Sequence, residues 1–257
     1  MANIHPTAIV DPRAELADDV TIGPHTIVES NVTIGNGTSI ASNALIASGA
    51  RIGNGVKVHH GAVIGTVPQD LKFGGEETTA EIGDNTVIRE YVTVNRGTED
   101  RWKTVVGSDC LLMAYAHVAH DCRIGNRVIM ANAVNLGGHV VIDEWAIIGG
   151  VVPVHQFVHV GKHVMVGGGF RITQDVCPYS LVAGYPLRVL GVNHVGLSRR
   201  GFSDDTIKSI RKAFKILFHS KLNTTQALAR IEQEFEPIPE IQEVIDFIHK
   251  AERGIVK

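Results

Sequence analysis

Large aliphatic side chains recur at every sixth position through the first two thirds of the chain. Stepping by six from Ile4 to Ile172, every position is Ile, Val, Leu or Met except Asp70, Glu76 and Asp100. Small residues, mostly Ala, Val, Thr and Cys, stand two positions before these aliphatic residues. A period of six is neither the 3.6 of an α-helix nor the 2 of an ordinary strand. It predicts short strands that each point one large and one small residue inward and are joined by corners.

Three such strands close a triangular coil of about 18 residues, and successive coils pair as parallel strands ~4.8 Å apart. The repeat therefore predicts a mainly β fold, a parallel β-helix with an aliphatic interior. The three exceptions to the repeat fall in two polar, glycine-containing stretches, TVPQDLKFGGEETTA and NRGTEDRWKT. We interpret these stretches as loops inserted into the β-helix, at about residues 67–80 and 97–104.

The repeat stops near residue 184, and the remainder of the chain has the pattern of helices. Ser203 is a suitable N-cap, and Asp204 and Asp205 suit a first helical turn. A second helix is expected at about residues 225–235 and a third after Pro239. The apolar stripe of the first of these helices contains Ile207, Ile210, Phe214, Leu217 and Phe218.

These patterns predict two domains, a β-helix over residues 1–186 and a small C-terminal α-helical domain over residues 187–257. The second domain begins with a basic stretch, because residues 186–221 carry eight Lys or Arg side chains against two Asp side chains. This stretch is either a solvated helix face or a docking patch for an acidic partner.

Composition narrows the classes of protein that the sequence can encode. The 257 residues are 44% hydrophobic but only 5% aromatic, and the net charge of −3 gives no argument for nucleic-acid or membrane binding. The N-terminus lacks a signal-peptide pattern, and no apolar run approaches the ~20 residues of a spanning helix. Three cysteines without a CxxC motif predict no disulfide framework, and Cys110 and Cys122 fall in small inward positions. We expect a soluble, cytoplasmic protein without stable membrane insertion.

Stacking of the coils predicts which polar residues meet, because residues 18 apart lie above one another. Asp121 stacks on His139, His120 stacks on Gly138, and His155 lies over Gly137. These four polar residues therefore share one outer face, beside a Gly137-Gly138 pair that leaves backbone N–H groups open. None of them occupies an inward position, so all are expected to reach solvent or a neighbouring subunit.

Three interpretations of this face compete. It is a polar solenoid surface, a metal site, or a general base surrounded by substrate-binding histidines. A zinc site needs about three convergent ligands of this kind, and the spacing differs from that of the hexapeptide-repeat carbonic anhydrases. The residues alone leave the three interpretations open.

The repeat resembles that of the hexapeptide-repeat acyltransferases, whose coils wind left-handed. More closely, AHVAHDC, VPQDLKFGGE, NLGGHV, VVPVHQF, HVMVGG and NHVGLSRRGF resemble the motifs of the UDP-N-acetylglucosamine 3-O-acyltransferases, which begin lipid A synthesis. The similarity covers nearly the whole chain, including both loops and the helical tail. It implies a left-handed parallel β-helix, a homotrimer with sites between adjacent solenoids, no cofactor and no metal. It also implies acyl carrier protein as acyl donor and UDP-N-acetylglucosamine as acceptor.

The resemblance assigns roles to particular residues. His120 would be the general base, Asp121 its electrostatic support, and Gly138 the donor of an N–H to the thioester oxygen. Gly168 would lie at the end of the acyl chain. Asp70 and Lys72 would help hold the sugar and the nucleotide. The substrate groove would be lined by His117, His139, His155 and Gln156. The nucleotide or the carrier's phosphopantetheine would be bound by Asn193, Arg199 and Arg200.

The chain departs from the family's usual motifs at two positions. Cys177 replaces a proline in QDVCPY, and Val195 replaces an acidic residue in the NHVGL segment. These departures leave open an acyltransferase that uses a 3-amino sugar nucleotide. The residues by themselves also allow a zinc-dependent hydratase or a non-catalytic scaffold.

Overall fold

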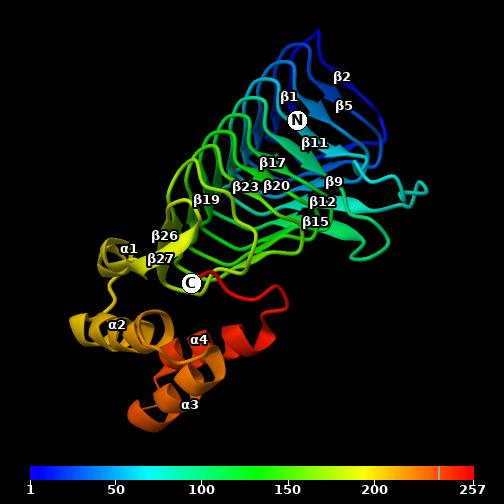
Figure 1. The fold of residues 1–257 in the computed structure, drawn as a ribbon. Helices are drawn as coiled ribbons and strands as arrows, with labels where there is room; N and C mark the ends of the chain where they lie inside the picture. The colour runs from blue at the N-terminus through cyan, green and yellow to red at the C-terminus, as the bar shows by residue number, and fades with distance from the viewer. Residues whose placement is uncertain (237) are drawn as a thin grey trace.

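The computed structural model describes residues 1–236 and 238–257, and it forms a triangular β-helix followed by a helical domain (Figure 1). Each face of the β-helix is one sheet of short parallel strands, and only the pair at the end of the first sheet, β26 (Ser180–Ala183) and β27 (Arg188–Val192), is antiparallel within the described residues.

Sheet A contains β1 (Asn3–Ile4), β4 (Thr21–Ile22), β7 (Ser39–Ile40), β10 (Lys57–Val58), β13 (Val87–Ile88), β16 (Leu111–Leu112), β19 (Ile129–Met130), β22 (Ile147–Ile148), β25 (Met165–Val166), β26 (Ser180–Ala183) and β27 (Arg188–Val192). Sheet B contains β2 (Ile9–Val10), β5 (Ile27–Val28), β8 (Leu45–Ile46), β11 (Val63–Thr66), β14 (Thr93–Asn95), β17 (His117–Val118), β20 (Asn135–Leu136) and β23 (Pro153–Val154). Sheet C contains β3 (Glu15–Leu16), β6 (Thr33–Ile34), β9 (Ala50–Ile52), β12 (Thr79–Ile82), β15 (Lys103–Val106), β18 (Arg123–Ile124), β21 (Val141–Ile142) and β24 (His159–Val160).

The six-residue repeat fills the interior of this prism. Large aliphatic residues such as Ile64, Leu112 and Ile148 are fully buried, and so are the small residues two positions earlier, such as Ala62 and Ala116. The thiols of Cys110 and Cys122 are also buried, and burial raises the pKa of Cys122 to about 12. The predicted left-handed parallel β-helix with an aliphatic interior is confirmed.

From residue 25 onward, most corners of the coil contain one residue with positive φ, which recurs every six positions in the regular coils. Non-glycine residues occupy many of these positions, among them Asn43, Asn85, Asp121 and His139, with φ between 55° and 65°. This left-handed conformation costs an ordinary L-residue roughly 1–2 kcal/mol. The hydrogen-bonded coils above and below hold the corners in it.

Both inserted loops leave the β-helix at the same corner, where the chain passes from sheet B to sheet C; we call it the B–C corner. The first connects β11 to β12 and the second connects β14 to β15, and Figure 1 shows both projecting from one edge. Strand partners are 18 residues apart in regular coils, as for Val106 and Ile124. They are 30 apart for Ile52 and Ile82 and 24 apart for Ile82 and Val106. The loops thus add 12 and 6 residues, which explains why the repeat stays in phase through them.

The C-terminal helices are α1 (His194–Arg199), α2 (Asp204–His219), α3 (Thr224–Glu234) and α4 (Pro239–Lys250). Ser203 caps α2 by accepting a hydrogen bond from the Thr206 N–H, and Asn223 and Gln226 form a capping box on α3. The three predicted helices are therefore confirmed, whereas the sequence pattern did not predict the short α1. Residue 186, the predicted end of the first domain, lies in the turn of the β26–β27 hairpin.

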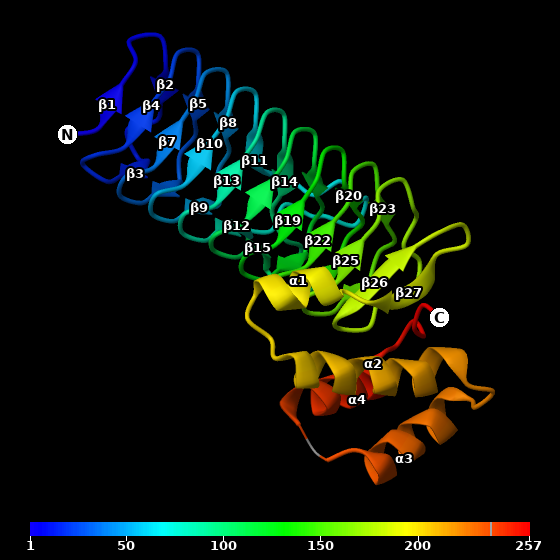
Figure 2. The ribbon, with the colours of Figure 1, turned by 90° about the vertical axis from the view of Figure 1, so that its left-hand side faces the viewer.

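The helices cover the C-terminal end of the β-helix (Figure 2). The apolar stripe of α2 packs on β27, and Ile210 and Phe214 are buried there. The His159 ring contacts the Phe247 ring of α4 at 4.7 Å between centroids, and the Lys162 Nζ lies 3.1 Å from the Glu243 Oε1. Within the described residues, no helix combines the length and the apolar character that crossing a membrane requires.

The fully buried aliphatic ladder should dominate the stability of the β-helix. We expect Ile148→Ala to lower the free energy of unfolding by about 2–5 kcal/mol, because it leaves a cavity in a dry interior. Denaturant unfolding followed by circular dichroism measures the change. The matched control is Ile27→Ala, whose side chain is 42% exposed and should cost far less. Equal losses for the two variants would contradict the assignment.

Candidate active site

The polar residues singled out from the sequence lie at the B–C corner, where three successive coils place their turns one above another. His120 and Asp121 stand between β17 and β18, and Gly138 and His139 occupy the same place one coil further on. Backbone pairing fixes this stack, because the His139 N–H donates to the His120 carbonyl at 3.0 Å. The predicted stacking of Asp121 on His139 and of His120 on Gly138 follows from this register.

His120 and Asp121 form a hydrogen-bonded pair. The Nδ1 of His120 lies 2.8 Å from the Oδ2 of Asp121. A carboxylate can only accept, so the proton resides on Nδ1 and leaves a free lone pair on Nε2. This is the tautomer that a general base requires.

Glycine at position 138 makes room for this imidazole. A Cβ on Gly138 would lie 2.6 Å from both Cε1 and Nε2 of His120. In residues 1–236 and 238–257, the Gly138 N–H makes no hydrogen bond. An unpaired N–H beside a basic Nε2 can bind an oxyanion that forms there.

Asp121 is completely buried and His139 is only 9% exposed, which corrects the expectation that all four polar residues reach solvent or a neighbouring subunit. The second inserted loop covers it. The Thr98 N–H and hydroxyl donate to the two carboxylate oxygens of Asp121 at 3.0 and 2.7 Å, and the Arg101 guanidinium donates to its carbonyl at 2.7 Å. Burial acts to raise the pKa of Asp121, but the hydrogen bonds from His120 and Thr98 outweigh it and leave that pKa below its usual value.

His139 is buried beside this pair and contacts it. Its ring lies edge-on to His120 at 5.2 Å and stacks on Phe157 at 4.5 Å, measured between ring centroids. The Nε2 of His139 lies 2.9 Å from the Asp100 Oδ2 and 3.6 Å from the Asp121 Oδ2. Asp100, again from the second loop, is therefore the nearer acceptor for this imidazole.

A cavity of about 470 Å³ opens over the pair. Both inserted loops contribute to it, together with the two histidines and the turn after β23. The Asp70 carboxylate accepts a hydrogen bond from the Lys72 N–H, which orders the tip of the first loop. The lining residues are Gln69, Asp70, Lys72, Phe73, Glu76, Thr98, Glu99, Asp100, His120, His139, Gln156 and Phe157.

The other candidates along the solenoid do not line this cavity. His117 lies on β17, where its Nδ1 is 2.7 Å from the Thr93 hydroxyl, and burial together with the charge of His120 lowers its pKa. The Nδ1 of His155 lies 3.0 Å from the Gln156 carbonyl oxygen. Gly168 is exposed further along the solenoid, with a built Cβ only 3.1 Å from the carbonyl oxygen of Gly150.

Asn193, Arg199 and Arg200 lie at the helical end of the chain and also stand outside the cavity lining. Asn193 is buried, where its side chain caps α1 and donates to the His163 carbonyl. Arg200 lies over the Trp145 ring at 5.1 Å. Burial and the charge of Arg200 lower the pKa of His163 to about 4.

The sequence did not single out Thr98 or Phe157 as site residues. The one available signal was Asp100, which interrupts the six-residue repeat and so marked the second loop. Loop residues have no periodicity from which their contacts could be read.

The metal interpretation has one structural counterpart. Ligand atoms of His120, Asp121 and His139 lie within 4.8 Å of one another. The set has two histidines and one carboxylate. His120 is hydrogen-bonded to Asp121, and His139 is hydrogen-bonded to Asp100. The geometry is therefore explained without an ion.

Comparison with known proteins decides between the remaining interpretations. Residues 175–256 match the family described as Udp N-acetylglucosamine O-acyltransferase, Domain 2, and residues 1–36, 31–66 and 103–138 match Bacterial transferase hexapeptide repeats. The acyl-[acyl-carrier-protein]–UDP-N-acetylglucosamine O-acyltransferase of Thiobacillus denitrificans is 46% identical over 258 residues, covering 100% of both chains. The chain belongs to the UDP-N-acetylglucosamine O-acyltransferase family.

Solved structures agree with this assignment. The UDP-N-acetylglucosamine acyltransferase of Bacteroides fragilis superposes with a TM-score of 0.96 at 46% identity, covering 98% of this chain and 99% of that one. The corresponding structure from Acinetobacter baumannii gives a TM-score of 0.95 at 43% identity, with 99% of each chain covered. The resemblance drawn from the motifs is confirmed, and the chain is an O-acyltransferase rather than a hydratase or a scaffold.

Because this acyltransferase has so little room beside His120, Gly138→Ala should displace the imidazole from its place over the corner. We expect the His120 ring resonances in an NMR spectrum to shift, while the circular dichroism spectrum stays unchanged. Gly150→Ala is the matched control, since the nearest atom to a Cβ there is 3.3 Å away. Unchanged His120 resonances in the Gly138 variant would contradict this packing.

Proposed function

We propose that this acyltransferase moves an acyl chain from the thioester of acyl carrier protein to the 3-hydroxyl of UDP-N-acetylglucosamine, the reaction that begins lipid A synthesis. The observation that carries the proposal is the His120–Asp121 pair, whose free Nε2 stands beside the open N–H of Gly138 under a cavity of about 470 Å³. Full-length relatives that carry this activity in their names support it.

The proposed reaction proceeds by direct attack. His120 Nε2 takes the proton from the sugar 3-hydroxyl as its oxygen attacks the thioester carbonyl carbon. The Gly138 N–H donates to the resulting oxyanion. The tetrahedral intermediate then breaks its carbon–sulfur bond, and the imidazolium of His120 returns the proton to the leaving thiolate. General-base catalysis of this kind contributes roughly 10²–10⁴-fold.

The two inserted loops supply the groups that hold the acceptor in this proposal. Lys72 provides a positive charge for the diphosphate, and Asp70 provides an acceptor for sugar hydroxyls. Gln156 and His139 line the opposite wall of the cavity. The acyl chain would run along the turns at Gly150 and Gly168, two stacked glycines that present no side chain of their own.

A homotrimer is part of the proposal. Asn193, Arg199 and Arg200 do not line the cavity of their own chain. These residues can bind the nucleotide or the phosphopantetheine if the helical domain of one chain lies beside the cavity of a neighbouring chain. We propose that the enzyme works in the cytoplasm, where acyl carrier protein and nucleotide sugars are made.

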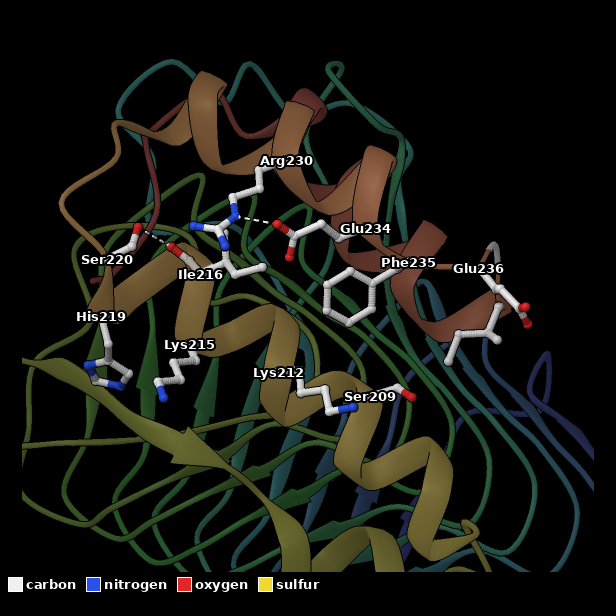
Figure 3. A pocket seen from close by; sticks show the side chains of 11 residues that line it. Ser209, Lys212, Lys215, Ile216, His219, Ser220, Arg230, Glu234, Phe235 and Glu236 are labelled. Carbon is white, nitrogen blue, oxygen red and sulfur yellow. Dashed lines mark hydrogen bonds and ion pairs between the residues drawn. The ribbon is translucent and has the colours of Figure 1, made fainter.

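The basic stretch of the helical domain is the proposed docking patch for the acidic carrier protein. Two hollows lie on either side of a ridge along α2, which is formed by Lys212, Lys215 and His219. One hollow has an apolar floor that includes Leu190, Val192 and Phe214. The other lies between α2 and α3 and contains Arg230, which is paired with Glu234 at 2.7 Å (Figure 3).

Removal of the base tests the reaction itself. His120→Ala should reduce turnover of acyl-acyl carrier protein and UDP-N-acetylglucosamine by at least about 10²-fold, since the group that takes the hydroxyl proton is lost. Mass spectrometry of the acylated sugar nucleotide measures the product, and gel filtration with circular dichroism checks that the assembly is intact. Undiminished turnover by a folded variant would rule out His120 as the base.

Charge reversal on the ridge tests docking of the carrier. Lys215→Glu should raise the KM for acyl-acyl carrier protein by roughly 3–10-fold and reduce its salt dependence, because it repels an acidic partner. With an acyl-pantetheine donor, which lacks the carrier protein, Lys215→Glu should react as fast as the wild type. Lys250→Glu, an exposed change on α4, is the matched control. Equal KM values for the two variants would contradict docking at the ridge.

A further inference from the structure

The second inserted loop places one residue directly against the buried carboxylate of the proposed dyad. Thr98 is 7% exposed and contacts both oxygens of Asp121. Its backbone N–H donates to Oδ1 at 3.0 Å, and its hydroxyl donates to Oδ2 at 2.7 Å. Oδ2 is also the oxygen that accepts from His120 Nδ1 at 2.8 Å. Thr98 and His120 therefore share one carboxylate oxygen.

We propose that Thr98 is a positioning residue for the reaction: its hydroxyl fixes the orientation of Asp121 and takes up part of its charge, which keeps His120 neutral and ready to accept a proton. The proposal rests on the function proposed above, in which His120 is the base. It adds a residue from the inserted loop whose effect on the reaction passes through Asp121.

Two physical effects follow from the shared oxygen. A buried carboxylate must be compensated by donors, and charge-assisted hydrogen bonds are roughly twice as strong as neutral ones. Without the Thr98 hydroxyl, His120 becomes the main compensating group, so the carboxylate favours its imidazolium form. An imidazolium cannot act as a base, and the fraction of competent enzyme at neutral pH falls.

The second effect concerns His139. Its Nε2 lies 3.6 Å from the same Oδ2 and is held by Asp100 at 2.9 Å. Once the Thr98 hydroxyl is gone, the vacated lone pair of Asp121 can attract His139 and turn the carboxylate away from His120. The Asp121 orientation that suits His120 thus depends on Thr98 filling that position.

The loop has anchors other than the Thr98 hydroxyl. The Arg101 guanidinium donates to the Asp121 carbonyl, the Trp102 N–H donates to the Thr98 carbonyl at 2.7 Å, and the Asp121 N–H donates to the Thr104 hydroxyl at 2.8 Å. Substitution of Thr98 by valine keeps its volume and its backbone N–H. The loop should therefore stay in place when only the hydroxyl is removed.

Substitution of Thr98 changes none of the other charged or titratable residues around the dyad. These residues are His117 on the same coil, His139 on the next, Asp100 and Arg101 on the second loop, and the cavity residues Asp70, Lys72, Glu76 and Glu99.

The test compares Thr98→Val with Thr98→Ser in the full-length enzyme, using acyl-acyl carrier protein and UDP-N-acetylglucosamine. Thr98→Val should lower kcat by roughly 10–100-fold, as for loss of a hydrogen bond to a charged group, with each KM within about threefold of the wild type. The pH range over which kcat/KM rises should shift to higher pH by roughly one unit. The difference in kcat/KM between the variant and the wild type should therefore become smaller at higher pH. Thr98→Ser should restore kcat to within about threefold of the wild type. It should also return the rise of kcat/KM with pH to within a few tenths of a pH unit of the wild type.

The matched control is Thr38→Val. Thr38 is also buried, and its hydroxyl donates to the Gly53 carbonyl at 2.8 Å and accepts from the Val56 N–H at 3.1 Å. This control should lower the melting temperature without changing kcat or the pH profile. Should Thr98→Val not fold, Thr98→Cys takes its place with the same expectation, because a thiol is a weak donor.

Three results would overturn the inference: wild-type kcat and pH profile in Thr98→Val, a Thr98→Ser variant as slow as Thr98→Val, or a slow Thr98→Val in which the rise of kcat/KM with pH has not shifted. The last would mean that Thr98 serves only to fold the loop. His120→Ala in the same assay separates the two levels of the proposal. If it is inactive while Thr98→Val behaves as wild type, only the role of Thr98 fails; if it is active, the assignment of the base fails.

Discussion

The backbone hydrogen bonds between successive coils decide which side chains of this protein can meet. Strands of the regular coils pair in parallel with the strand one coil away, and this pairing repeats without slippage. Side chains at one corner are therefore held at the ~4.8 Å spacing of parallel strands. His120 lies over a glycine and Asp121 over a histidine because of this register and not because of any local preference of those residues.

The site combines this rigid corner with two irregular loops that emerge from it. The corner supplies the imidazoles, which must stay at fixed distances from each other. The loops supply Thr98, Asp100, Asp70 and Lys72, which orient those imidazoles or line the cavity. The absence of the six-residue repeat in the loops is what frees their side chains from the interior. A polar residue in an inward position of a regular coil would instead be buried among aliphatic side chains.

Periodicity and stacking allowed much of this protein to be predicted from its sequence. The aliphatic repeat predicts the β-helix, capping residues such as Ser203 predict the helices, and counting by coil length brings His120 to Gly138. The loop contacts could not be predicted, because nothing in NRGTEDRWKT indicates that Thr98 turns back onto Asp121. For the same reason no pattern indicated that Asp121 is buried, since its corner position points outward and only the loop covers it. The left-handed winding also came from family resemblance, as general preferences for parallel crossovers favour the opposite hand.

The positive φ angles at the corners have a consequence for the evolution of this enzyme. Asp121 and His139 adopt φ of 61° and 65°, in a region that glycine occupies freely and that costs other L-residues free energy. Glycine would relieve backbone strain at both positions, but at position 121 it would also remove the buried carboxylate that Thr98 and His120 bind. The same conformation recurs at corners outside the site, for example at Tyr91 and Val151, so the stacked coils carry this cost throughout and leave the choice of corner side chain open to function.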